Sequence, residues 1–197
     1  MPEDKQQIKI GLTGGIGAGK TFIGKIFSKL GFPVFNSDVE AKRCMLEDEI
    51  LKKKIQDLFG DEVYQNGVLQ NHFLANIVFN DEKHLEHLNK LVHPLVKKKF
   101  EKWCKKNDSK IVIKEAAILF ESNSHINLDK VICVSADKEI RIQRIIKRDN
   151  ISREEVIARM SRQISQNEKE RLSDFIIVNN GSQLLLPQII KLINKID

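Results

Sequence analysis

Eight residues near the start of the chain have the types and the spacing of a phosphate-binding loop. Residues 14–21 read Gly-Gly-Ile-Gly-Ala-Gly-Lys-Thr and match the pattern G-x-x-x-x-G-K-[ST] in full. Glycines let the backbone turn so that several N–H groups face one anion, and a helix that starts there directs its positive end at the same anion. The residues expected to line this nucleotide site are Gly14, Gly15, Gly17, Ala18, Gly19, Lys20, Thr21 and Phe22.

The last two residues of the loop indicate which chemistry it supports. The ammonium group of Lys20 is expected to contact the β and γ phosphates of ATP, and the hydroxyl of Thr21 is expected to coordinate Mg²⁺. An apolar segment precedes the loop and an amphipathic segment follows it, which is the setting that the pattern requires. We therefore predict a kinase that uses Mg²⁺ with ATP as its phosphate donor.

Asp38 is the candidate for the group that prepares the acceptor. It follows the short apolar run 34–36, and the ends of the first two strands of a parallel sheet lie near the phosphate loop. A carboxylate there can orient or deprotonate an attacking hydroxyl and can also lie beside Mg²⁺. The alternative is a structural role as the N-cap of the next helix, for which Ser37 competes.

Arginines are concentrated in the segment that we expect to cover the nucleotide. Arg141, Arg144 and Arg148 share one helix face by their spacing, and three more arginines follow across a short turn. Guanidinium groups on a mobile lid can neutralise the charge that develops during phosphate transfer, and we assign this role to Arg144 and Arg148. The alternative is a solvated pair of helices with internal ion pairs, since acidic residues lie nearby.

The elements that position these residues alternate between strands and helices. Five apolar runs of strand length are separated by segments with helical spacing. Runs that are apolar throughout are typical of a parallel sheet buried on both faces, so we predict an α/β fold with an open, doubly wound, five-stranded sheet. The predicted strands are residues 8–13, 34–36, 111–113, 130–134 and 175–178.

A single kinase unit over residues 1–197 accounts for this pattern. Its core is expected to comprise residues 7–36, 111–136 and 174–197, with an Arg-rich helical lid at about 140–168. The segment from about 37 to 110 is mostly helical in pattern, with a turn at Gln65-Asn66-Gly67, and is too long for a simple crossover. We predict that it is an inserted helical substrate subdomain.

Composition narrows the class of protein further. The chain has a net charge of +6, but its lysines are dispersed without interleaved aromatic residues, which favours solvated helix faces over a nucleic-acid surface. No apolar run reaches the roughly 18 residues of a membrane span, and the polar start is not that of a secretory signal. Three cysteines without metal-binding spacing indicate reduced thiols, so we expect a cytoplasmic protein.

The two short strings that mark GTPases also occur in this chain, as residues 57–60 and 194–197. A base-reading loop has to follow a strand, whereas the first string lies in a helical pattern and the second closes the last helix. We therefore reject the GTPase interpretation.

Several separated motifs, in order along nearly the whole chain, resemble the dephospho-CoA kinase family. The resemblance includes the loop variant that begins at Leu12-Thr13 and the Asn36-Ser37-Asp38 segment. The other matching segments are Ile77-Val78-Phe79, Leu88-Asn89, Leu91-Val92-His93-Pro94-Leu95, Ile118-Leu119-Phe120-Glu121, Arg148-Asp149 and Asn179-Asn180-Gly181.

This resemblance implies a reaction and further site residues. The reaction is the transfer of the γ-phosphate of ATP to the ribose 3′-hydroxyl of dephospho-CoA, on a fold like that of nucleoside monophosphate kinases. Asp38 matches the catalytic carboxylate and is also expected at the metal. Asn179 and Gly181 would lie near the adenine of ATP. On the acceptor side, the resemblance implies His93, Leu119 and Glu121.

The chain departs from the family pattern at two positions. Asn36 stands where many relatives have an acid, and Ala117 stands where proline is usual. Two other functions remain as alternatives. They are a small-molecule kinase with a nucleotide, sugar or shikimate-like acceptor, and a non-enzymatic, ATP-dependent protein that binds nucleic acid.

Overall fold

The computed structural model describes residues 7–196, apart from the side chains of residues 79, 80 and 82. The chain divides into two compact units. The sheet unit comprises Met1–Phe35 together with Asn107–Asp197, and the helical unit comprises Asn36–Lys106. Among the described residues, no helix combines the length and the apolar character that a membrane crossing requires.

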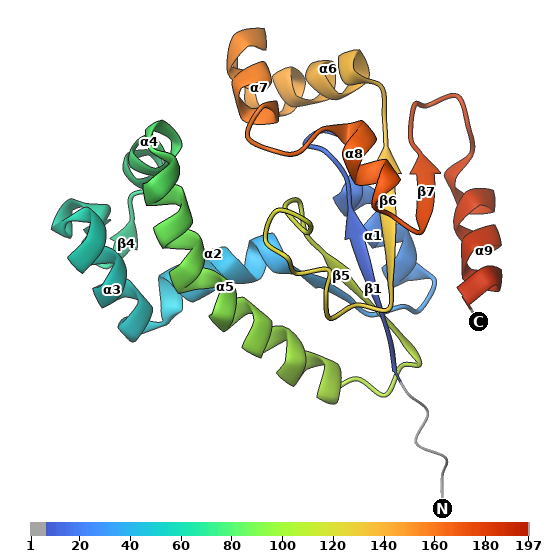
Figure 1. Ribbon diagram of the computed structural model, residues 1–197, viewed down its shortest axis with the longest axis horizontal. Helices are drawn as coiled ribbons and strands as arrows, with labels where there is room; N and C mark the ends of the chain where they lie inside the picture. Colours follow the sequence, from blue (N-terminus) through green and yellow to red (C-terminus); the bar gives the residue numbers. More distant parts are fainter. Residues whose placement is uncertain (1–6, 197) are drawn as a thin grey trace, which may run out of the picture. The chain divides into compact units, whose positions relative to one another are not determined.

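A five-stranded parallel sheet forms the centre of the sheet unit, as the apolar runs predicted (Figure 1). The order of its strands is β2-β5-β1-β6-β7. Their bounds are Ile8–Thr13 for β1, Val34–Asn36 for β2, Ile111–Glu115 for β5, Lys130–Ser135 for β6 and Phe175–Val178 for β7. Strand β5 is two residues longer than its apolar run, because Lys114 and Glu115 continue the pairing with β1 and are buried.

The register of the sheet brings the carboxyl ends of three strands together. Leu12 of β1 is paired with Glu115 of β5, and Thr13 is paired with Cys133 of β6. Because the strands are parallel, the segments that leave them start at the same edge of the sheet, where ligands bind in folds of this class. The loop after β1 therefore begins next to the end of β5.

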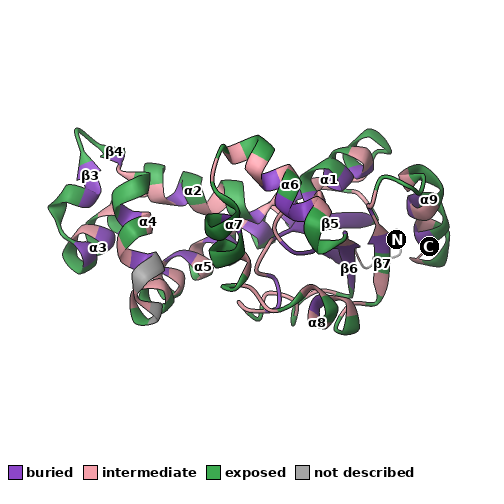
Figure 2. Ribbon diagram, turned by 90° about the horizontal axis from the view of Figure 1, so that it is seen from above, coloured by how far each residue is buried: buried purple, intermediate pink, exposed green. Residues whose placement is uncertain are grey.

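Helices cover both faces of the sheet. Figure 2 shows α1 and α9 on one side of it and α8 on the other. The helices of this unit are α1 (Lys20–Lys29), α6 (Lys138–Asp149), α7 (Arg153–Met160), α8 (Gln166–Arg171) and α9 (Leu185–Ile196). Apolar side chains of α1 and α9, among them Phe27 and Leu192, join those of the strands in one core cluster. This packing fixes the start of α1 relative to the strand that precedes the loop.

Local signals decide where several helices begin. The spacing of Ser152 and Glu155 predicts a capping box. The structure confirms it, because the Ser152 hydroxyl accepts a hydrogen bond from the N–H of Glu155 and the side chain of Glu155 accepts one from the N–H of Ser152. At α2, the cap is neither Ser37 nor Asp38 but Asn36, whose Oδ1 accepts a hydrogen bond of 2.9 Å from the N–H of Val39. Asp38 is thus not used as a helix cap.

The helical unit contains more than helices. Its elements are α2 (Ser37–Glu47), α3 (Glu49–Phe59), a 3₁₀ turn η1 (Asp61–Val63), β3 (Tyr64–Gln65), β4 (Val68–Leu69), α4 (Asn71–Asn80) and α5 (Glu82–Lys105). The predicted turn is confirmed at Asn66 and Gly67, which both have positive φ, and the structure adds a small antiparallel hairpin around it. Asp57 lies inside α3, as predicted.

One helix boundary predicted from the sequence is wrong. Proline is favoured at the first position of a helix, so the sequence alone predicts that a helix starts at Pro94, but this residue lies inside the 24-residue helix α5. Proline removes one backbone donor from the interior of a helix. Apolar residues on both sides of this position, Val92 and Val96, are buried, so packing continues through it.

Candidate active site

The phosphate-binding loop lies between β1 and α1 and depends on glycine conformations. Gly17 and Gly19 have φ values of 82° and 96°, in the left-handed region that glycine adopts without steric cost. Gly19 is the N-cap of α1, so the loop ends where the first unpaired N–H groups of the helix begin. A side chain on Gly19 would overlap the amide nitrogen of Asn179. The sequence pattern and the backbone therefore agree on a compact anion cradle.

Lys20 opens α1 and lies against the loop. Its Nζ donates hydrogen bonds to the carbonyl oxygens of Gly14, at 3.0 Å, and Gly15, at 3.4 Å. The residue is only 9% exposed, so its charge is held in a protected position. These contacts place the ammonium group beside the main-chain groups predicted to receive phosphate.

Thr21 contacts a carboxylate that the sequence interpretation missed. Its Oγ1 donates a hydrogen bond of 2.6 Å to Oε1 of Glu115, the last residue of β5. Glu115 is 3% exposed, and its other oxygen lies near Gly24 of α1. A signal was available, since a carboxylate directly after a buried strand is a frequent ligand for Mg²⁺ in loops of this kind. The adjacency of β5 and β1 was needed to recognise it.

Asn179 and Arg144 contact the second half of the loop. Asn179 donates from Nδ2 to the carbonyl oxygen of Ala18 at 2.8 Å. Nη2 of Arg144 donates to the carbonyl oxygen of Asn179 at 2.9 Å, and Nη1 lies 3.4 Å from the carbonyl oxygen of Gly17. Gly181, two residues further on, is exposed and has a φ of 84°. The structure thus brings together Arg144, Asn179 and the loop.

Arg148 lies elsewhere on the sheet unit. It is exposed, and its guanidinium makes two hydrogen bonds, of 2.7 and 3.0 Å, to the carboxylate of the next residue, Asp149. Arg159 adds a third contact at 2.9 Å. The hydrogen bond from Arg148 is the main reason that the pKa of Asp149 is lowered. These contacts correspond to the alternative of paired surface arginines, so a role for Arg148 in transfer stays a prediction.

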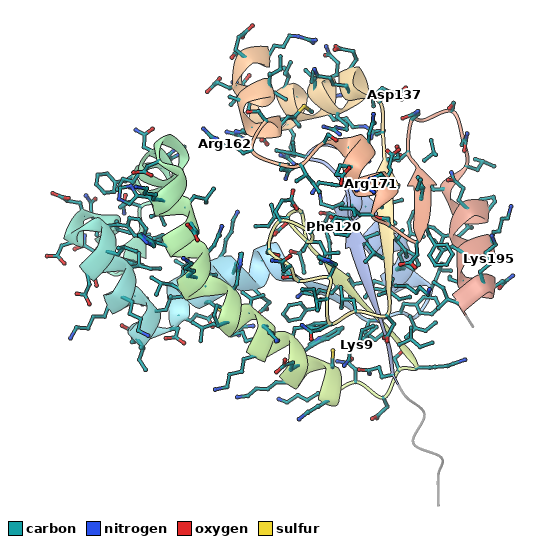
Figure 3. All side chains as sticks on the ribbon, viewed as in Figure 1. Lys9, Phe120, Asp137, Arg162, Arg171 and Lys195 are labelled. Carbon is teal, nitrogen blue, oxygen red and sulfur yellow. The ribbon has the colours of Figure 1, made fainter. Side chains whose placement is uncertain are left out.

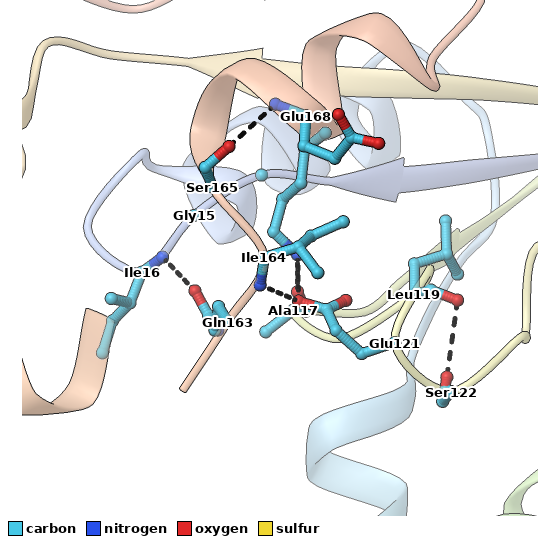
Figure 4. A network of polar contacts seen from close by, with 12 residues as sticks. Gly15, Ile16, Ala117, Leu119, Glu121, Ser122, Gln163, Ile164, Ser165 and Glu168 are labelled. Atoms are coloured by element: carbon cyan, nitrogen blue, oxygen red, sulfur yellow. Dashed lines mark hydrogen bonds and ion pairs between the residues drawn. The ribbon is translucent and has the colours of Figure 1, made fainter. Parts of the chain in front are cut away.

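Two glutamines from the predicted lid reach the loop amides. The N–H of Gly15 donates to Oε1 of Gln166 at 2.9 Å. The N–H of Ile16 donates to Oε1 of Gln163, also at 2.9 Å (Figure 4). Gln166 begins α8, and Gln163 lies between α7 and α8. No motif in the sequence marked these residues, because glutamine is ordinary in polar helical segments.

A buried ion pair anchors the same segment. The Nζ of Lys169, which is fully buried, lies 2.6 Å from Oε1 of Glu121 and 3.0 Å from the carbonyl oxygen of Ala117. The same Glu121 oxygen accepts a hydrogen bond of 3.1 Å from the N–H of Ile164 (Figure 4). Glu121 therefore ties the loop after β5 to the chain on either side of Gln166.

Leu119 belongs to the core of this loop. It is fully buried in a small apolar cluster with Ala116, Phe120 and Val131, and Figure 3 shows Phe120 in the loop that follows β5. Leu119 also leaves no room for a side chain at position 11, because a Cβ on Gly11 would lie 2.6 Å from Cδ2 of Leu119. The structure shows Leu119 in a packing role. Its expected contact with the acceptor stays a prediction.

Three further candidates have clear local settings. Phe22, in the first turn of α1, is 57% exposed, as a residue lying over a bound nucleotide could be. In the helical unit, Asp38 is exposed in the first turn of α2, and its side chain makes no described contact. His93 is half-buried inside α5. Their roles toward the nucleotide or the acceptor stay predictions.

The protein groups available to a metal are few. Among the residues that the structure describes, no three His, Cys, Asp or Glu side chains are grouped to hold an ion. Mg²⁺ at kinase sites is usually bound by one or two protein groups, substrate phosphates and water. The hydroxyl of Thr21 and the carboxylate of Glu115 fit that arrangement.

Comparisons with known proteins identify the family of this chain. The sequence model of the family described as "Dephospho-CoA kinase" matches residues 8–184. The dephospho-CoA kinase of Bacteroides fragilis is 38% identical over 187 residues, which are 94% of this chain and 91% of that protein. A crystal structure from Thermus thermophilus superposes with a TM-score of 0.86 at 31% identity and covers 96% of this chain and 97% of that one.

A solved structure with the family name is also similar. The dephospho-CoA kinase from Campylobacter jejuni has a TM-score of 0.69 and 29% identity, with 95% of this chain and 96% of that chain covered. The family model and the relatives extend over almost the whole chain, including the loop, Glu115 and the glutamine segment. On this basis, the chain belongs to the dephospho-CoA kinase family.

Proposed function

We propose that this chain transfers the γ-phosphate of Mg²⁺-bound ATP to the ribose 3′-hydroxyl of dephospho-CoA, giving CoA and ADP. One observation carries the proposal beyond family membership. The loop of residues 14–19 lies directly beside a threonine–carboxylate pair, Thr21 and Glu115, in a protein whose relatives bear this activity. Main-chain donors, a cation and metal ligands are the groups that phosphate transfer requires.

ATP is held mainly by the loop. The main-chain N–H groups of the loop and of the first turn of α1 bind phosphate oxygens, and Lys20 neutralises charge on the β and γ phosphates. The adenine lies near Asn179 and Gly181, which places the base at the end of the loop that Asn179 already contacts through Ala18. Phe22 is exposed beside the start of α1 and borders the same site.

The metal site would use Thr21 and Glu115 of the sheet unit, with Asp38 as a further ligand. Mg²⁺ supplies neutralisation of charge between the β and γ phosphate oxygens. In the described protein the Thr21 hydroxyl is bonded to Glu115, so the carboxylate orients the hydroxyl oxygen that would face the ion. This use of Glu115 extends the metal site beyond the residues that sequence motifs had suggested.

Asp38 accepts the proton of the 3′-hydroxyl as the phosphate leaves ATP. Its carboxylate is exposed and unused in capping, because Asn36 performs that function. Arg144, tied to the loop, neutralises charge as the phosphate moves, and Arg148 has the same proposed role from the lid. The acceptor is bound by the helical unit through His93 and by Glu121 at the loop after β5.

We also propose a cytoplasmic location. The three cysteines, Cys44, Cys104 and Cys133, are buried, and none of them is in a disulfide. Free thiols of this kind are typical of a reducing compartment.

A coupled assay of ADP release, run over a panel of acceptors, tests the function. The panel contains dephospho-CoA, adenosine, AMP and shikimate, and the product is identified by mass spectrometry. We expect ADP release in step with CoA formation and dependent on Mg²⁺. Turnover with another acceptor, and none with dephospho-CoA, would refute the proposal. A catalytically dead control, Lys20→Ala, excludes a contaminating kinase.

A further inference from the structure

Arg141 is a buried arginine beside the phosphate-binding loop, and within residues 7–196 it forms no direct ion pair with a carboxylate. It lies on α6 and is 7% exposed. In the described part of the chain, its guanidinium makes one hydrogen bond, from Nη1 to Oε1 of Gln166 at 3.0 Å, and its Nε is buried without a partner. Burial is the main reason that its pKa is lowered. The charge of Glu170 opposes this shift but does not outweigh burial. A desolvated cation without a direct ion pair gains stabilising free energy when an anion binds to it.

The position of this guanidinium is set by contact with the loop. A Cβ on Gly15 would lie 2.5 Å from Nη1 and 2.8 Å from Cζ of Arg141, so the guanidinium occupies the space that a side chain would need. The main chain of Arg141 also lies against the loop, since a Cβ on Gly17 would approach its carbonyl oxygen to 2.6 Å. The residue is therefore part of the wall of the anion cradle.

Gln166 holds the guanidinium in this place. Its Oε1 accepts hydrogen bonds from both the N–H of Gly15 and Nη1 of Arg141. Its Nε2 donates to the carbonyl oxygen of Val134, at 3.2 Å, and to Oε1 of Glu170, at 2.9 Å. Both ends of the amide are thus used, and the side chain links the loop, β6 and α8 in one orientation. Nη2 of the guanidinium makes no hydrogen bond to the described residues, and its N–H groups are suited to bind a phosphate oxygen.

We infer that Arg141 binds the terminal phosphate of the nucleotide, and that Gln166 is its positioning residue. The inference rests on the proposed function for the direction of the nucleotide along the loop. If the adenine lies near Asn179, at the Gly19 end of the loop, the terminal phosphate lies toward the other end of the loop, at Gly15. The guanidinium of Arg141 lies at that end. The guanidinium that Gln166 holds in place would thus contact ATP through a phosphate that ADP lacks.

Binding of ATP and ADP to the protein without acceptor tests this inference. We compare Arg141→Met, Arg141→Lys and the exposed control Gln143→Met on the same helix by calorimetry. Loss of a charge-assisted contact is expected to weaken ATP binding about 10-fold or more in Arg141→Met, with ADP binding changed less than about threefold. Arg141→Lys keeps the charge without the fork and is expected to be intermediate. The control is expected to bind both nucleotides as the wild type does.

Thermal unfolding separates a binding role from a structural one. Methionine replaces an unpaired buried cation and leaves Gln166 Oε1 bonded to Gly15, so the nucleotide-free Arg141→Met protein is expected to unfold at the same temperature or higher. The extra stabilisation by ATP is expected to shrink with the weaker binding. Equal losses for ATP and ADP, or a lowered unfolding temperature with unchanged ATP binding, would overturn the inference. If Arg141→Met fails to fold, the ratio of ATP to ADP affinity in Arg141→Lys decides in the same way.

The positioning role of Gln166 is tested by coupling. Gln166→Met is expected to reduce the preference for ATP over ADP in the wild-type background but not in the Arg141→Met background. Independent effects in the two backgrounds would show that Gln166 acts without Arg141. These measurements need no acceptor. A chain that fails to phosphorylate dephospho-CoA would refute the proposed function alone, whereas a wild-type-like Arg141→Met would refute the inference alone.

Discussion

The hydroxyl of Thr21 donates a 2.6 Å hydrogen bond to the carboxylate of Glu115, which joins the first turn of α1 to the end of β5. The two residues are 94 positions apart and meet because β5 is paired with β1 in parallel. Glu115 is 3% exposed, so its charge has little water to stabilise it and gains from a nearby cation. This contact connects the phosphate-binding loop to the carboxylate that we propose as a metal ligand.

Glu115→Gln is predicted to weaken Mg²⁺ binding selectively. Glutamine can still accept the Thr21 hydrogen bond but lacks the negative charge, so the Mg²⁺ concentration for half-maximal activity is expected to rise about 10- to 100-fold. Binding of metal-free ATP should change little. Titration of activity with Mg²⁺ at saturating ATP measures this. Glu168→Gln, which removes an exposed carboxylate paired with Arg171, serves as control. An unchanged Mg²⁺ requirement in Glu115→Gln would exclude Glu115 from the metal site.

Asp38→Asn is predicted to slow the chemical step. Asparagine cannot accept the proton of the acceptor, and loss of a general base lowers turnover by about 10² to 10⁴. ATP affinity should stay near the wild-type value, because the loop supplies most of the binding. Steady-state kinetics with a separate ATP-binding measurement distinguish the two effects. Asp57→Asn, on the exposed side of α3, is the matched control. Near-full turnover in Asp38→Asn would end the candidacy of this residue.

Removing one partner of the buried pair of Lys169 and Glu121 is predicted to lower the free energy of unfolding more than replacing both partners by neutral residues. Lys169→Met leaves the Glu121 carboxylate with its partner removed, and the free energy of unfolding should fall by about 3–5 kcal/mol. The double variant Lys169→Met/Glu121→Gln should recover part of that loss, because no charge is then left unpaired. Chemical denaturation measures all three proteins.

A surface pair provides the comparison for this prediction. Lys130 and Asp174 are in contact at 3.1 Å but are partly solvated. Breaking them with Lys130→Met should change the free energy of unfolding by less than about 1 kcal/mol. A similar loss in Lys130→Met and Lys169→Met would contradict the distinction drawn between the buried pair and the surface pair.

The buried thiol of Cys133 is expected to make the protein less stable at alkaline pH. Burial raises the pKa of its thiol from 9.0 to about 11, because the thiolate is disfavoured beside the β6 core. Below pH 9 the thiol is neutral in both the folded and the unfolded chain, and its contribution to stability is fully present. Between pH 9 and 11 the unfolded chain loses the proton first, so this contribution is lost as the pH rises.

Cys133→Ala isolates that contribution. The variant is expected to be less stable than the wild type at pH 8, since it leaves a small cavity. The difference between the two proteins should narrow as the pH is raised toward 11, and urea denaturation across this range measures it. A constant difference from pH 8 to 11 would rule out a buried, neutral Cys133 thiol.

Much of the fold followed from local patterns. The loop motif, the five apolar runs, the turn at Asn66-Gly67 and the capping box at Ser152 are each encoded within a few consecutive residues, and the structure confirms all four. The prediction that a helix starts at Pro94 was wrong. Burial of Val92 and Val96 on either side of it outweighs the local preference of proline for the first position of a helix.

By itself, the sequence determined the class of protein and the position of its phosphate-binding loop, because glycine, lysine and threonine at fixed spacing encode a backbone shape and its charge. Tertiary structure alone showed that Glu115 meets Thr21, that Gln166 meets Gly15 and that Lys169 is fully buried. It also separated Arg141, which lies at the loop, from Arg148, which is paired at the surface. These contacts join residues far apart in the chain, and the register of the parallel sheet and the packing of α8 against it, rather than any local preference, decide them.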